Sequence, residues 1–62
     1  MNRALHPRAV RPTAAELLTE AVRAVDLSRA LRLLPRSDVS GRRMIRSELR
    51  RIARLHAAAT VE

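Results

Sequence analysis

The spacing of apolar residues in the C-terminal third constrains the fold most. Residues that can pack against a neighbouring helix recur there at alternating intervals of four and three, which is the pattern of a helix–helix seam. The members of this set are Ile45, Leu49, Ile52, His56 and Ala59. Leu55 widens the same face. We therefore expect a long amphipathic helix over about residues 41–58, with its apolar side against a partner helix.

The other side of this helix is basic. Arg43, Arg46, Arg50 and Arg54 fall within roughly 80° of one another on a wheel of 3.6 residues per turn, almost opposite the apolar set. Arg42 and Arg51 add two more guanidinium groups to the same segment. Because a guanidinium binds phosphate through two hydrogen bonds and stays charged, these six arginines are the candidate phosphate contacts.

Composition limits how well such a chain can stabilise itself. It has 62 residues without cysteine or aromatic residues, and alanine makes up much of its apolar content. So small a domain usually needs disulfides, a metal or a partner subunit. Cysteine is absent, and the two histidines, His6 and His56, do not form a zinc site. We therefore predict no metal and no cofactor, and we expect a homo-oligomer or a subunit of a larger complex, held through Ile45, Leu49, Ile52, Leu55 and His56.

A second helical segment is expected to begin at Thr13. The run Thr13-Ala14-Ala15-Glu16 matches a capping box, and Glu20 is placed to pair with Arg23 one turn later. The apolar residues before Asp26 and those after it point to nearly opposite sides of a continuous helix. We favour a break or kink near Asp26, with an unbroken helix buried on all sides as the alternative. Pro35 ends the segment in either case.

The remaining segments are expected to be non-helical. Residues 1–12 have no apolar periodicity and carry Arg3, Arg8 and Arg11, so we interpret them as a flexible basic arm. Residues 35–40 form the expected loop, in which Ser37, Asp38 and Ser40 are candidate N-caps for the last helix. Residues 13–58 then make a single domain, and residues 59–62 should fray. The predicted fold is all-α: a small helical hairpin or three-helix unit, oligomeric in solution.

The sequence offers little for catalysis or membrane insertion. Glu16 and Glu20 lie one turn apart but are best interpreted as solvated residues of a helix face, and one glycine cannot make a phosphate-binding loop. The chain has no apolar run long enough to span a membrane, and its helices lack aromatic anchors for a membrane surface. We expect a non-enzymatic protein of the cytoplasm.

Charge gives the functional hypothesis. The formal net charge is +7, and the excess lies in the arm and in the last helix, while the middle of the chain is balanced. This distribution favours a small nucleic-acid-binding or regulatory protein, in which the arginine-rich helix contacts phosphates and the arm reaches an adjacent minor groove. The alternative is an accessory, adaptor or inhibitor subunit whose basic helix docks on an acidic protein surface.

Overall fold

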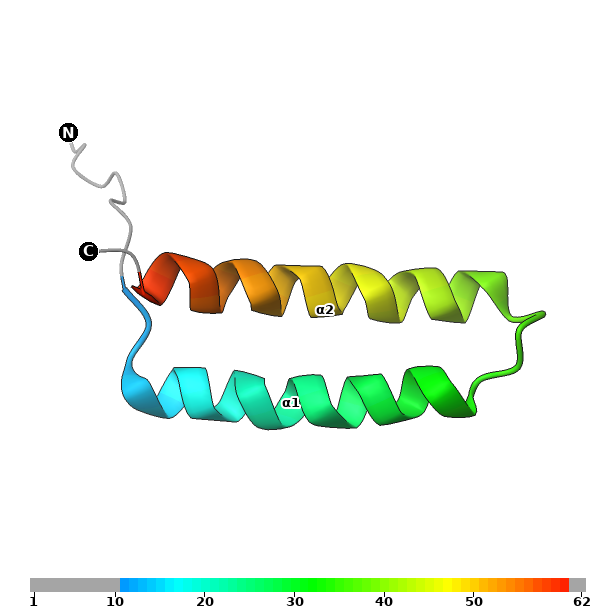
Figure 1. Cartoon of the computed structure of the whole chain (residues 1–62), viewed down its shortest axis with the longest axis horizontal. Coiled ribbons are helices and arrows are strands. Elements are labelled where there is room, and N and C mark those ends of the chain that lie inside the picture. Colours follow the sequence, from blue (N-terminus) through cyan, green and yellow to red (C-terminus); the bar gives the residue numbers. More distant parts are fainter. Residues whose placement is uncertain (1–10, 61–62) are drawn as a thin grey trace, which may run out of the picture.

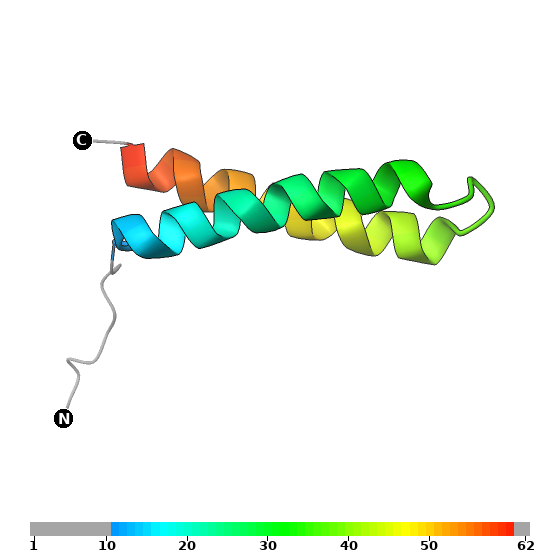
Figure 2. The same cartoon turned by 90° about the horizontal axis from the view of Figure 1, so that it is seen from below.

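The chain folds into an antiparallel pair of helices. A computed structural model describes residues 11–60, which form α1 (Ala14–Leu33) and α2 (Val39–Thr60) with a short turn between them. The two helices lie side by side along their whole length and cross at a shallow angle (Figures 1 and 2). The described residues contain no strand. The all-α hairpin is therefore confirmed, and the three-helix alternative is not what the structure shows.

The start of α1 agrees with the predicted capping box. The Thr13 hydroxyl accepts a hydrogen bond from the Glu16 backbone N–H at 3.0 Å, and a Glu16 carboxylate oxygen accepts one from the Thr13 backbone N–H at 2.8 Å. Thr13 itself is extended, with φ −75° and ψ 165°, so the first helical residue is Ala14. Two backbone donors that would otherwise lack partners are satisfied by side chains that the sequence places three residues apart.

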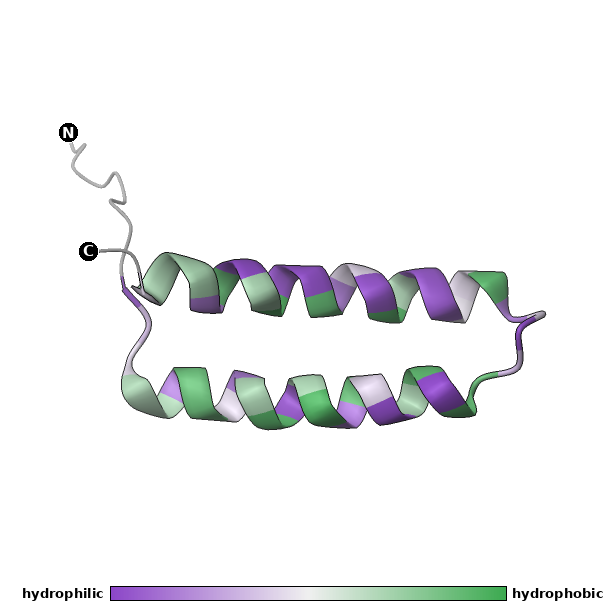
Figure 3. Cartoon of the chain, viewed as in Figure 1, coloured by the Kyte–Doolittle hydropathy of each residue, from purple (hydrophilic) through white to green (hydrophobic). Residues whose placement is uncertain are grey.

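The predicted break near Asp26 is wrong, because α1 is continuous from Ala14 to Leu33. The helix is not buried on all sides either. One face, which includes Leu17, Ala24 and Leu31, is partly buried, while Leu18 and other apolar residues on the opposite face are exposed. One continuous helix accommodates both apolar directions, because apolar residues from before and after Asp26 are partly buried. Figure 3 shows apolar segments spread along α1 and more hydrophilic bands along the middle of α2.

The turn is fixed by the residues at its two ends. Leu34, immediately before Pro35, is extended with φ −72° and ψ 142°, and its N–H still donates to the Ala30 carbonyl at 3.0 Å. The Asp38 carboxylate accepts a hydrogen bond from the Gly41 backbone N–H at 2.9 Å, and the Asp38 carbonyl accepts one from the Arg42 N–H. Asp38 is thus the N-cap of α2 among the three candidates.

The helix α2 is two residues longer at each end than the predicted range of 41–58. At its start, the cap at Asp38 allows Val39 and Ser40 to join the first turn. At its end, the Thr60 hydroxyl donates a hydrogen bond to the Ala57 carbonyl at 2.9 Å, so the helix includes two of the residues expected to fray. None of the described helices is long and apolar enough to cross a lipid bilayer.

The apolar set of α2 packs against α1 of the same chain. Ile52 is the most enclosed member, with only 3% of its surface exposed, and Ile45, Leu49, Leu55 and His56 are partly buried around it. The partner helix expected from the seven-residue pattern is therefore α1. Ile52 is the only apolar residue of the described range that is classed as buried, which leaves the hairpin with a thin core.

Candidate functional site

The arginines of α2 divide into three groups according to what their guanidinium groups contact. Arg43, Arg46, Arg50 and Arg54 are exposed and form the predicted stripe. Their mean direction lies roughly 160° from that of Ile52 on a helical wheel, so the stripe faces away from α1. Arg42 and Arg51 were expected to contact phosphates as well, but in the structure both guanidinium groups make contacts that join α2 to α1.

Arg42 holds the end of α1. One of its terminal nitrogens, Nη1, donates to the Leu31 carbonyl at 3.3 Å and lies 3.5 Å from the Leu34 carbonyl. Leu31 lies in the last turn of α1 and Leu34 is its C-cap, so neither carbonyl has a partner within the helix, and a cation there also matches the helix dipole. Arg42 is consequently half-buried, with its guanidinium anchored in place.

Arg51 is the centre of an ion-pair cluster across the hairpin. Its Nη2 atom lies 3.0 Å from a Glu48 carboxylate oxygen and 3.1 Å from one of Glu20, and Arg23 lies 3.7 Å from Glu48. The pKa of Glu48 is lowered, first because Arg51 donates hydrogen bonds to its carboxylate, and the pKa of Arg51 is raised in return. The expected pairing of Glu20 with Arg23 is replaced by pairs between α1 and α2.

Five arginines line one groove near the turn. Its walls are formed by Arg36, Val39, Arg42, Arg43, Arg46 and Arg50, and it encloses a volume of about 320 Å³. We call it the arginine groove. Among the described residues that line it there is no acid, so nothing in the wall neutralises the guanidinium groups. Arg36 comes from the turn and was not among the predicted contacts, because its approach to α2 depends on how the turn folds.

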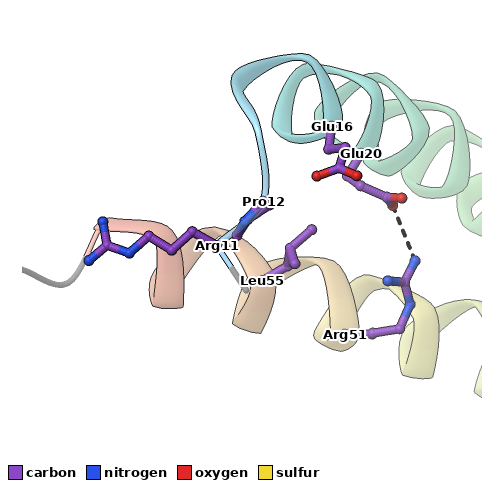
Figure 4. A pocket seen from close by; sticks show the side chains of 6 residues that line it. All are labelled: Arg11, Pro12, Glu16, Glu20, Arg51 and Leu55. Carbon is purple, nitrogen blue, oxygen red and sulfur yellow. Dashed lines mark hydrogen bonds and ion pairs between the residues drawn. The ribbon is translucent and has the colours of Figure 1, made fainter. Parts of the chain in front are cut away.

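A second cleft, at the opposite end of the hairpin, has carboxylates that already accept hydrogen bonds within the chain. It is lined by Arg11, Pro12, Glu16, Glu20, Arg51 and Leu55 (Figure 4). Glu16 is used in the capping box, and Glu20 accepts a hydrogen bond from Arg51. The guanidinium of Arg11 points away from both glutamates (Figure 4). This cleft therefore offers little unsatisfied charge to a ligand, in contrast to the arginine groove.

The other predicted site residues have the following positions. Arg11 is exposed before α1 and lines the second cleft, whereas Arg3 and Arg8 lie outside the described residues. Ile45, Leu49, Ile52, Leu55 and His56 lie between the two helices of a single chain. The Nε2 atom of His56 is buried there without a hydrogen-bond partner among the described residues.

Comparison with known proteins adds no family to this description. The chain matches no family model, and it gives no significant match to curated proteins or to solved structures.

Proposed function

We propose that this protein is a small non-enzymatic nucleic-acid-binding or regulatory protein that contacts phosphates through the arginine groove and the arginine stripe of α2. The observation that carries the proposal is the gathering of five guanidinium groups around a groove without an acidic neighbour in its wall. Guanidinium groups in such a cluster repel one another, and an anionic ligand relieves that repulsion. They also match the planar geometry of phosphate oxygens.

The dimensions of the stripe suit a polymer of phosphates. Residues 43–54 span about 16 Å of helix at 1.5 Å per residue. A duplex carries one negative charge per about 1.7 Å of its axis, so several phosphates lie within reach of a rod of this length. Arg42 contributes to the groove from a fixed position because its Nη1 atom is held by the carbonyls at the end of α1. Contacts made mostly with the phosphate backbone of the nucleic acid favour binding with little preference for base sequence.

Salt dependence is the direct test. With four to five phosphates neutralised, the logarithm of the association constant for a DNA duplex should fall with the logarithm of salt concentration with a slope near −4, from about −0.9 per contact. Replacing Arg46 and Arg50 by glutamine should make that slope shallower by about 2 and weaken binding, while circular dichroism shows unchanged helix content.

The matched control removes two arginines from the other helix. Arg23 and Arg32 are exposed on α1, so their replacement by glutamine changes the net charge by the same amount without touching the groove. The control variant should keep the wild-type slope. If both pairs of substitutions change the slope equally, binding follows net charge alone and the groove is not the binding surface.

The second candidate is an accessory, adaptor or inhibitor subunit that docks on an acidic protein surface. The contacts of Arg51 favour it, because that guanidinium binds two carboxylates of its own chain, and the exposed arginines of the stripe offer the same chemistry to a partner's carboxylates. Absence of duplex binding at low salt would overturn the nucleic-acid proposal and favour this candidate. Both proposed functions assume that the protein is oligomeric and lies in the cytoplasm.

A further inference from the structure

The outer face of α1 carries an apolar strip that the hairpin leaves uncovered. It consists of Leu18, Val22, Val25 and Leu33, whose surfaces are 67%, 55%, 55% and 79% exposed. These are four of the six large apolar residues that are exposed in the described range, so exposed apolar residues are concentrated on this face of α1. On a helical wheel its centre lies roughly 150° from that of the partly buried residues of α1.

We infer that this outer strip is the contact between two copies of the chain, which pair through α1 in an antiparallel, two-fold arrangement. The inference gives a surface to the oligomer named in the proposed function, and it is independent of phosphate binding. A second copy supplies an equal apolar strip without any further partner. It would also add a layer to a hairpin in which only Ile52 is buried among the described apolar residues.

The distribution of charge between the two helices favours self-association through the outer face of α1. α1 carries three acids and three arginines, whereas α2 carries six arginines and one acid, with the exposed stripe directed away from α1. Two copies that meet through α1 therefore bring weakly charged surfaces together and keep both arginine stripes on the outside. Any pairing through the stripes would instead bring like charges together.

Asp26 and Arg29 set the direction of the pair. Both are exposed, have opposite charges and lie one turn apart at the strip. Among the described residues neither takes part in an ion pair within the chain. When two α1 helices run antiparallel about a point between residues 27 and 28, Asp26 of each copy faces Arg29 of the other. The same register places Val22 of each copy against Leu33 of the other, and it places Leu18 opposite the turn that follows α1.

The first experiment measures association by sedimentation equilibrium over micromolar to millimolar concentrations. Because the strip is a small interface, we expect a dimer with a dissociation constant in the micromolar range. Val22→Asp should weaken association by roughly a hundredfold, since a carboxylate would be buried at the contact. Met44→Asp is the control: Met44 is also 67% exposed, but it lies on α2, and its substitution should leave association unchanged.

A charge-reversal experiment tests the register and the identity of the partner. Asp26→Arg and Arg29→Asp each place like charges across the two-fold axis, so each variant alone should dimerise roughly tenfold more weakly. An equimolar mixture of the two variants restores both opposite-charge pairs and should associate as strongly as the wild type. No gain on mixing overturns the antiparallel register.

The results distinguish a failure of the outer strip as the dimer contact from a failure of the proposed oligomer. A wild-type chain that stays monomeric throughout overturns both the oligomer and this surface. A wild-type dimer that tolerates Val22→Asp as well as it tolerates Met44→Asp overturns the surface alone. Neither result affects the duplex-binding test, because that test depends on arginines on the opposite side of the hairpin.

Discussion

Replacement of Ile52 by alanine is expected to remove a large part of the stability of the hairpin. Ile52 is 3% exposed and is the best-enclosed apolar residue of the described range. The substitution deletes three carbon atoms, which at about 0.8 kcal/mol per buried methylene amounts to about 2.4 kcal/mol of lost transfer free energy. A cavity would raise the cost, but two helices can approach each other and partly close it, so we expect about 2–3 kcal/mol.

That loss is large compared with what a chain of this size can have. At about 0.05–0.15 kcal/mol per residue, a hairpin of about 50 residues has a free energy of unfolding of about 2.5–7.5 kcal/mol. Urea unfolding followed by circular dichroism, at a fixed protein concentration, measures the difference. Met44→Ala, which also removes three heavy atoms but at a 67% exposed position, should change stability by less than about 0.5 kcal/mol. Equal effects of the two substitutions would refute the view that the hairpin is organised around Ile52.

Two further predictions concern the turn and the ion-pair cluster. Asp38→Ala should destabilise the chain by about 1 kcal/mol through loss of the N-cap. A Cβ at position 41 would lie 2.6 Å from the Asp38 carboxylate, so Gly41→Ala should stabilise only the Asp38→Ala variant, and an equal gain in the wild type would contradict the capping geometry. Because Arg51 lowers the pKa of Glu48 from its ordinary value of 4.5, the ionised carboxylate stabilises the fold above that pH. This contribution should disappear as the pH falls through the lowered pKa, and Glu48→Gln should flatten that part of a plot of the urea midpoint against pH.

The arginine stripe shows how far the candidate site follows from the sequence. Regular helical spacing is enough to place Arg43, Arg46, Arg50 and Arg54 on one side of α2, as expected. The same spacing does not reveal that Arg42 reaches back to the carbonyls of Leu31 and Leu34, because that contact joins residues 11 and 8 positions apart across the turn. The groove wall formed by Arg36 is missed for the same reason.

Three local features of this protein follow directly from its amino-acid sequence: the capping box at Thr13, the end of α1 before Pro35, and the two-sided character of α2. Each of these depends on residues within about one turn of each other, where backbone hydrogen bonding and helical periodicity decide the outcome. The continuation of α1 past Asp26 depends instead on packing, since both apolar directions fit one helix when α2 covers one side. The position of Arg51 between Glu20 and Glu48 also depends on packing, because an ion pair between helices is set by their register and not by spacing along the chain.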